Sequence, residues 1–165
     1  MHAIVCIKQV PDTNEVKMDP ERGTLIREGV PAIINPFDAY AIEEGIRLKE
    51  AHGGKTTVVT MGPPQALDAI KEAVAMGCDD GVLISDRAFA GADTWATAYT
   101  LAQAVRKLGE VDVIVCGRQA ADGDTGHVFP GDICQAADRD ALAFVATIEF
   151  RAEEIDRRTK LVRGL

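Results

Sequence analysis

The sequence predicts a three-layer α/β fold with a mainly parallel central sheet. Short apolar runs of strand length alternate along the chain with segments in which apolar residues recur at helical spacing. Several of the short runs, such as Ala3–Ile7, are apolar at every position, which is typical of strands buried on both faces. Repetition of strand, helix and strand builds a parallel sheet that carries helices on both faces.

Five core strands are predicted from these apolar runs. In chain order they are Ala3–Ile7, Thr56–Met61, Gly81–Ser85, Asp112–Cys116 and Ala143–Phe150. A polar loop follows the first strand, and short extended segments are expected at Thr24–Ile26 and Ala32–Ile34. The charged stretch Arg151–Arg158 is expected to be a turn between strands or a frayed end.

The first two helices are delimited by capping residues and glycines. Asn35 and Asp38 are candidate N-caps of a helix with Pro36 in its first turn, and this helix ends near His52, before two glycines. The second helix ends at Gly77. Its apolar side chains at spacings of three and four residues are Leu67, Ile70 and Val74.

The third helix is predicted to begin after Asp93, a candidate N-cap. Its apolar stripe consists of Trp95, Ala98, Leu101, Ala102, Val105 and Leu108. A stripe with this spacing favours a place in the hydrophobic core over a platform for a cofactor. A fourth helix is expected to begin near Pro130.

Composition indicates one globular domain covering residues 1–165, because 47% of the residues are hydrophobic and 27% are charged. The 18 Lys and Arg residues are outnumbered by 26 Asp and Glu residues, which gives a net charge of −8. This charge argues against binding to nucleic acids or to anionic membrane surfaces. Without a run of about 18 apolar residues, no membrane insertion is expected.

The four cysteines do not form a Cys-x-x-Cys pair, so the usual spacings of zinc sites and of thioredoxin-type redox sites are missing. Cys6 and Cys116 lie in apolar runs and are expected to be small buried side chains. Reduced cysteines suit a cytoplasmic protein. The first residues indicate a strand rather than a signal peptide. Neither a catalytic set of side chains nor a metal site is predicted.

Ligands of parallel α/β sheets bind beyond the carboxyl ends of the strands, at a topological switch point. This rule selects four loops, which are Lys8–Thr13, Met61–Gln65, Asp86–Thr94 and Gly117–Pro130. The last loop leads into a predicted helix, so the backbone amides of Thr125–Val128 would attract phosphate. Asp122 and Asp124 would repel phosphate unless they point away and brace the loop. A surface turn rich in Asp and Gly is the alternative interpretation.

These loops carry a resemblance that runs collinearly from Met1 to about Val128. The segments that carry it are Val5–Thr13, Asn35–Asp38, Ala41–Glu44, Thr60–Gln65, Ala75–Asp79, Phe89–Thr94 and Cys116–Thr125. Together they resemble the β subunit of electron transfer flavoprotein. The Lys8–Thr13, Met61–Gln65 and Phe89–Thr94 segments are more similar to the electron-bifurcating or anaerobe-type branch of that family.

The resemblance implies a Rossmann-like three-layer sandwich of the adenine nucleotide alpha hydrolase-like type. It also implies a heterodimer with an α subunit, which transfers electrons between flavin dehydrogenases, such as acyl-CoA dehydrogenase, and an acceptor. Its redox FAD lies mainly in the α subunit, and the β subunit binds AMP or, in bifurcating members, a second FAD. Members of this kind carry electrons and have no catalytic residues of their own.

The resemblance also implies a nucleotide pocket in this chain. Its residues would be Cys6, Asn35, Met61, Cys116, Gly117, Asp122, Gly123, Asp124, Thr125, Gly126, His127 and Val128. Asn35 would hold the adenine or ribose, and Thr125–Val128 would hold the phosphates.

The sequence departs from the family pattern near the end of this pocket. His127 stands where the family usually has Gln, and Phe129 replaces an expected Gly. The similarity fades after Pro130, and the chain stops at Leu165, so the fold is expected to be a C-terminally truncated β subunit. The alternative function is a stand-alone module of similar fold that binds an adenine nucleotide.

Overall fold

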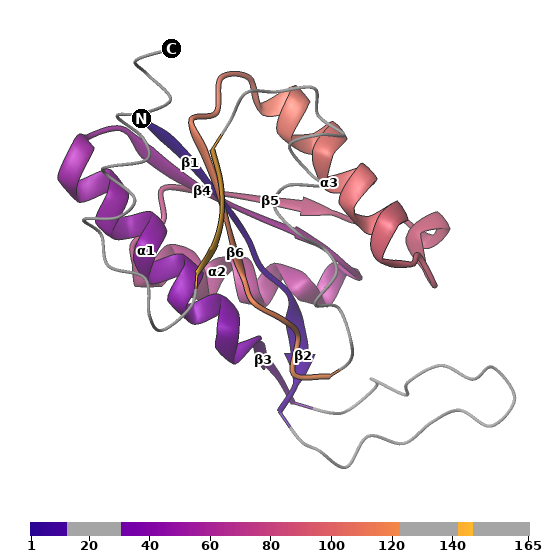
Figure 1. Cartoon of the computed structure of the whole chain (residues 1–165). Helices are drawn as coiled ribbons and strands as arrows, with labels where there is room; N and C mark the ends of the chain where they lie inside the picture. Colours follow the sequence, from indigo (N-terminus) through magenta and orange to yellow (C-terminus); the bar gives the residue numbers. More distant parts are fainter. Residues whose placement is uncertain (13–30, 123–141, 147–165) are drawn as a thin grey trace, which may run out of the picture.

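The computed structural model of the chain describes residues 1–12 and 31–122, together with the backbone of a further strand at 142–146. It has a central sheet in the strand order β5-β4-β1-β6-β7, in which all neighbours run parallel (Figure 1). These strands are β1 (His2–Cys6), β4 (Lys55–Met61), β5 (Asp80–Ile84), β6 (Val113–Gly117) and β7 (Leu142–Ala146). The short strands β2 (Gln9–Pro11) and β3 (Ala32–Ile34) pair antiparallel in a separate ribbon.

The helices cover both faces of the sheet, which confirms the predicted three layers. Helices α1 (Pro36–His52) and α2 (Leu67–Met76) lie on one face, and α3 (Thr94–Leu108) lies on the other (Figure 1). Two short 3-10 turns, η1 (Pro64–Ala66) and η2 (Arg87–Phe89), follow β4 and β5. Among the described helices, none is long and apolar enough to cross a bilayer.

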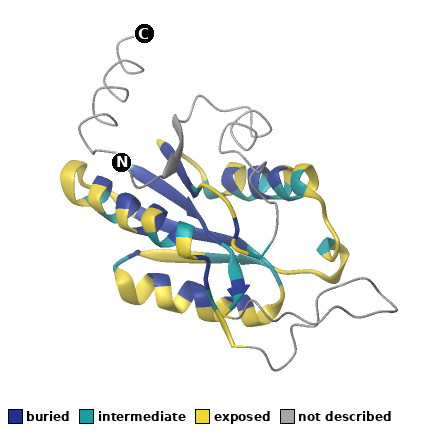
Figure 2. Cartoon of the chain, turned by 60° about the horizontal axis from the view of Figure 1, so that its bottom comes forward, coloured by how far each residue is buried: buried dark blue, intermediate teal, exposed yellow. Residues whose placement is uncertain are grey.

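The hydrophobic core has two parts, because successive residues of a strand point to opposite faces. Ala3 and Val5 of β1 pack toward α1 and α2, whereas Ile4 and Cys6 pack toward α3. Figure 2 shows the same pattern, with buried residues in the sheet and on the inner sides of the helices. The continuous apolar run at the start of the chain is therefore explained by burial on both faces.

The order of the strands creates a switch point beside β1. After β1 the chain builds β4 and then β5 on one side, and it returns through α3 to place β6 on the other side of β1. Such a reversal leaves a crevice at the carboxyl ends of the two strands that flank it. A ligand-binding crevice is therefore expected beyond the ends of β1 and β6.

Most predicted elements are confirmed within one or two residues. The Asp93 carboxylate caps α3 by accepting a hydrogen bond of 2.8 Å from the Ala96 amide, as expected. The last predicted strand corresponds to β7, although residues 147–150 lie outside the described residues. The expected segment at Thr24–Ile26, the helix near Pro130 and the stretch at Arg151–Arg158 lie outside them as well.

The predicted inner faces of two helices need correction. Trp95 is 60% exposed, and Leu67 and Val74 of α2 are also exposed. The rest of the prediction is largely confirmed, since Ala98, Leu101, Ala102 and Val105 of α3 and Ile70 of α2 are buried. The buried face of α2 also includes Ala69 and Ala73, which the spacing of larger apolar residues did not single out. Alanines let a helix lie close to the sheet, and larger side chains on its flanks are then left outside the contact.

Helix α1 lies close to the sheet at Gly45. A Cβ atom at this position would be 2.6 Å from Cγ2 of Val5 and 3.2 Å from Cγ2 of Thr56. The Thr56 hydroxyl also donates a hydrogen bond of 3.0 Å to the carbonyl of Gly45. Because these neighbours belong to packed strands, the glycine is needed for the close approach.

We therefore expect Gly45→Ala to lower the free energy of unfolding by about 1–3 kcal/mol, since overpacking outweighs the better helix propensity of alanine. Urea denaturation of the two proteins measures this difference. Glu50→Ala, at an exposed position of the same helix, should change the unfolding free energy by less than about 0.5 kcal/mol. An equally stable Gly45→Ala variant would contradict the close packing.

Candidate functional site

The crevice beyond β1 and β6 is organised by a buried carboxylate. Asp38 lies in the first turn of α1, and only 5% of it is exposed. Its Oδ2 atom accepts a hydrogen bond of 2.7 Å from the backbone amide of Lys8, just beyond β1. It also accepts a hydrogen bond from the backbone amide of Gly117, at the end of β6. One side chain therefore joins the ends of the two strands.

The prediction that Asp38 caps α1 is wrong. The N-cap position belongs to Asn35, and no side chain caps this helix. Asp38 is a residue of the helix itself. Its carboxylate accepts a hydrogen bond from the amide of Lys8, beyond β1, and not from an amide in the first turn of α1. Pro36 lies in the first turn, as predicted, and has no amide hydrogen that would need a cap.

Asn35 ties the segment that follows β6 to the start of α1. Its side-chain nitrogen donates a hydrogen bond of 2.7 Å to the carbonyl of Gln119. Its side-chain oxygen accepts one of 3.0 Å from the amide of Ala121, and its own amide donates to the carbonyl of Lys8 at 2.8 Å. Because Asn35 is 1% exposed, these bonds form in a place closed to bulk water. Asn35 therefore occupies the N-cap position without capping the helix.

Gly117 is required by the close approach of α1. A Cβ atom at this position would collide with Oδ1 of Asp38 and would lie 2.9 Å from the backbone of Phe37. Because the backbone of Phe37 cannot give way as a flexible side chain would, any larger residue would push β6 away from α1.

A second carboxylate at this edge is paired with a lysine. Nζ of Lys8 lies 2.5 Å from Oδ1 of Asp122, whose side chain is 5% exposed. Asp122 was expected to repel phosphate unless it pointed away and braced the loop, and its contact with Lys8 ties residue 122 to the segment after β1. Asp124 lies outside the described residues.

Burial raises the pKa of Asp38 to about 7 from an ordinary value of 3.8. The hydrogen bonds from the amide of Lys8, the side chain of Asn35 and the amide of Gly117 oppose this rise, as does the positive charge of Lys8. Loss of hydration outweighs them, because a buried carboxylate cannot regain from a few donors all that water supplies.

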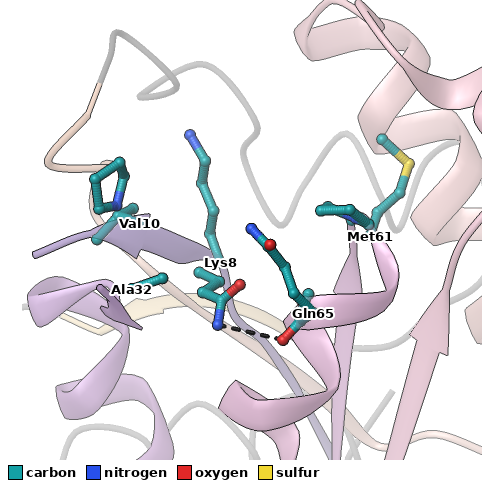
Figure 3. A pocket seen from close by; sticks show the side chains of 10 residues that line it. Lys8, Val10, Ala32, Met61 and Gln65 are labelled. Carbon is teal, nitrogen blue, oxygen red and sulfur yellow. Dashed lines mark hydrogen bonds between the residues drawn. The ribbon is translucent and has the colours of Figure 1, made fainter. Parts of the chain in front are cut away.

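A small pocket lies next to the crevice, between the β2–β3 ribbon and the turn after β4 (Figure 3). Its lining residues are Lys8, Gln9, Val10, Pro11, Ala32, Met61, Gly62, Pro63, Gln65 and Ala66. The side-chain amide of Gln9 donates a hydrogen bond of 3.4 Å to the carbonyl of Gln65. The pocket encloses about 40 Å³, whereas sites for whole ligands enclose at least about 300 Å³. It can therefore hold only one part of a ligand.

The structure brings several of the predicted site residues to this edge. Cys6 and Cys116 are register partners near the ends of β1 and β6, and both are buried, as predicted. Met61 ends β4 and lines the pocket. The predicted site residues that lie outside the described part of the chain are Gly123, Asp124, Thr125, Gly126, His127 and Val128.

Sequence reasoning missed how the edge is held together. Lys8 was singled out only as part of a loop, and Asp38 only as a cap. The available signal was the presence of two capping-type residues, Asn35 and Asp38, where a single cap suffices. The gathered groups are backbone amides, carboxylates and an ammonium, which are suited to binding. Within 1–12 and 31–122, no group of three His, Cys, Asp or Glu side chains could hold a metal ion.

Comparison with known proteins finds one matching family. The family model described as "Electron transfer flavoprotein domain" matches residues 22–160. The chain is 53% identical, over 94% of its length, to the electron transfer flavoprotein subunit beta of Thermoanaerobacterium thermosaccharolyticum. It is 50% identical, over 90% of its length, to the protein FixA of Azotobacter vinelandii. It is 51% identical, over 91% of its length, to the caffeyl-CoA reductase-Etf complex subunit CarD of Acetobacterium woodii.

The chain spans only part of these relatives. The matches cover 59%, 53% and 57% of the lengths of the three proteins, respectively.

The pair formed by Lys8 and Asp122 should contribute to stability, because the Asp122 carboxylate is almost fully buried. We expect Lys8→Met to lower the free energy of unfolding by about 2 kcal/mol, since it leaves that carboxylate without its cation. In a double-mutant cycle with Asp122→Asn, the coupling free energy should be at least about 1 kcal/mol. The exposed pair Lys71–Asp68 is the control and should couple by less than about 0.5 kcal/mol. Additive effects of the two changes at Lys8 and Asp122 would contradict the pairing.

The raised pKa of Asp38 predicts a pH dependence of stability. Folding favours the protonated form of Asp38, so this stabilisation is complete below about pH 4 and is lost as the pH rises toward 7. We expect the unfolding free energy of the unmodified chain, relative to Asp38→Asn, to fall by about 1 kcal/mol per pH unit across this window. Urea denaturation at several pH values measures the difference.

The control for this prediction is Thr100→Ala, which removes no titrating group. Its effect on the unfolding free energy should be the same at every pH. If the difference between Asp38→Asn and the unmodified chain were also constant between pH 4 and pH 7, Asp38 would not have the raised pKa.

Proposed function

Because the chain belongs to the electron transfer flavoprotein family, we propose that it acts as a β-type subunit of such a flavoprotein. It would bind AMP or a second FAD at the crevice between β1 and β6. Together with an α-type subunit it would transfer electrons between flavin dehydrogenases, such as acyl-CoA dehydrogenase, and an acceptor. The observation that supports the proposal is the switch point beside β1, where Lys8, Asp38 and Gly117 lie together at the ends of β1 and β6.

The described residues suit one end of an adenine nucleotide. The walls of the pocket include the apolar side chains of Val10, Met61 and Ala66, which would pack against a flat purine. The carboxamides of Gln9 and Gln65 offer hydrogen bonds to its polar edge. The rest of the nucleotide would extend past Asp122 toward Thr125–Val128, where we propose that its phosphates bind.

The residues of this chain would hold and orient the nucleotide. FAD, when bound, supplies the redox chemistry. Asn35 would fix the course of the segment after β6, and Lys8 would neutralise Asp122, so that a phosphate near this edge is not repelled. Cys6, Cys116 and Gly117 would form the floor between the two strands. We also propose a cytoplasmic location, which suits cysteines without the spacing of a disulfide or Cys-x-x-Cys framework.

The partners follow from the same family relationship. The name of the relative from Acetobacterium woodii describes a complex of a reductase with an Etf, which supports a role in passing electrons to or from such an enzyme. We propose the α-type subunit as the direct partner. A second FAD in place of AMP would make the complex a bifurcating one.

Titration calorimetry of the 165-residue chain with AMP and with FAD tests the binding site. We expect one site per chain for at least one of these ligands. Gly117→Ala should weaken binding by about tenfold or more, because the added methyl group displaces Asp38 and the end of β6. Glu50→Ala, remote from the crevice, should leave the affinity unchanged. A cooperatively folded chain that binds neither ligand would contradict the proposed function.

Co-expression with an α subunit of the family tests the role of the complex. We expect a heterodimer whose flavin content, measured by absorbance and acid extraction, separates two cases. Two flavins per heterodimer support bifurcation, and one flavin with one AMP supports an ordinary carrier. A homodimer that binds ATP and ignores the α subunit would favour the stand-alone nucleotide-binding module instead.

A further inference from the structure

We propose that Asp38 is a positioning residue of the nucleotide crevice, and that its carboxylate sets the separation between the ends of β1 and β6. The consequence for binding rests on the proposed function. The effect on the two strand ends concerns the free chain, and it can be measured without any nucleotide.

Asp38 lies at the point where the pairing of β1 with β6 ends. The last register partners of β1 and β6 are Cys6 and Cys116. Lys8 and Gly117 lie beyond this pair, where the two strands are no longer joined as a ladder. Their amides both donate to Asp38, at 2.7 Å in the case of Lys8. The carboxylate therefore connects the two strands beyond the end of their ladder, at the point where a ligand would enter.

The packing around Asp38 leaves the end of β6 little room to move relative to α1. Asp38 belongs to α1, which packs against both β1 and β6. At Gly117 the chain lies so close to the carboxylate and to the backbone of Phe37 that not even a methyl group fits. A change of a few tenths of an ångström at Asp38 must therefore be transmitted to the end of β6.

Two further contacts extend this connection along the chain. The side chain of Asn35 holds Gln119 and Ala121, and the ammonium of Lys8 holds Asp122. These contacts join Lys8, just after β1, and Asn35, just before α1, to residues 119–122. A displaced Gly117 would therefore also shift residues 119–122, which these contacts hold.

A purely structural role for Asp38 makes a different prediction. It would lower the stability of the fold but would leave the affinity of the folded molecules unchanged. A positioning role also changes the affinity and makes it depend on the charge of the carboxylate. Among described residues, the charged groups around Asp38 are Lys8, from the end of β1, and through it Asp122. Because its pKa is raised to about 7, Asp38 titrates in a pH range in which folded proteins are readily measured.

Amide nuclear magnetic resonance of the free chain between pH 5.5 and 8.5 is the first test. The amide shifts of Lys8 and Gly117 should follow a common titration near pH 7. In Asp38→Asn this titration should be absent, and hydrogen exchange at the amide of Ala121 should be faster by about tenfold. Glu44→Gln, which changes the other buried carboxylate of α1, should leave these signals unchanged.

Binding of AMP and of adenosine to the same proteins is the second test. Asp38→Asn should weaken binding of both by about tenfold, measured on the folded protein. Adenosine has no phosphate to titrate in this range, so its affinity profile should follow Asp38 in the unmodified chain and be flat in Asp38→Asn. Glu44→Gln should keep both affinities within about twofold.

The outcomes separate the proposals. Titrations of Lys8 and Gly117 that persist in Asp38→Asn, or nucleotide affinities that this change does not alter, would overturn the positioning role. If the unmodified chain bound no nucleotide, the proposed function would fail, and the amide measurements would still decide whether Asp38 controls the strand ends. If Asp38→Asn did not fold, the pH profile of the unmodified chain would decide, and a flat profile would overturn the inference.

Discussion

The crevice depends on the hydrogen bonds that one buried carboxylate accepts from two strands. A parallel ladder holds β1 and β6 together only as far as Cys6 and Cys116. Beyond this pair the backbone amides need other acceptors, because buried polar groups without partners are costly. Asp38 supplies an acceptor to both strands at once. The ends of the two strands are therefore positioned from α1.

The surrounding residues follow from this arrangement. Gly117 is small because α1 must come close enough for the contact with Asp38. The side chain of Asn35 binds the segment after β6, and α1 therefore begins without a side-chain cap. Lys8 contributes twice, since its amide binds Asp38 while its ammonium binds Asp122. The result is an edge in which the charge of Asp122 is paired and backbone groups are fixed before a ligand arrives.

The sequence was sufficient to predict the fold but only part of the site. Strands such as Val113–Gly117 can be predicted from the sequence, because a strand that is buried on both faces needs a continuous run of apolar residues. The cap at Asp93 is a local interaction and was predicted correctly. Asn35 and Asp38 have the same chemistry, yet their partners come from distant segments, which no local pattern reveals. Trp95 was misplaced for a related reason, since helical spacing does not say how closely alanines let the helix approach the sheet.

The tight fit at Gly117 also links two positions that lie far apart in the sequence. A side chain at residue 117 is excluded by the carboxylate of Asp38 together with the backbone of Phe37. Changing one position therefore alters what the other can tolerate. Among homologous sequences, residues 38 and 117 should vary in concert, with a larger residue at 117 accepted only where 38 is shorter and the helix has shifted outward. An alignment of homologous sequences would therefore indicate, from these two positions, how closely α1 lies to β6 in each protein.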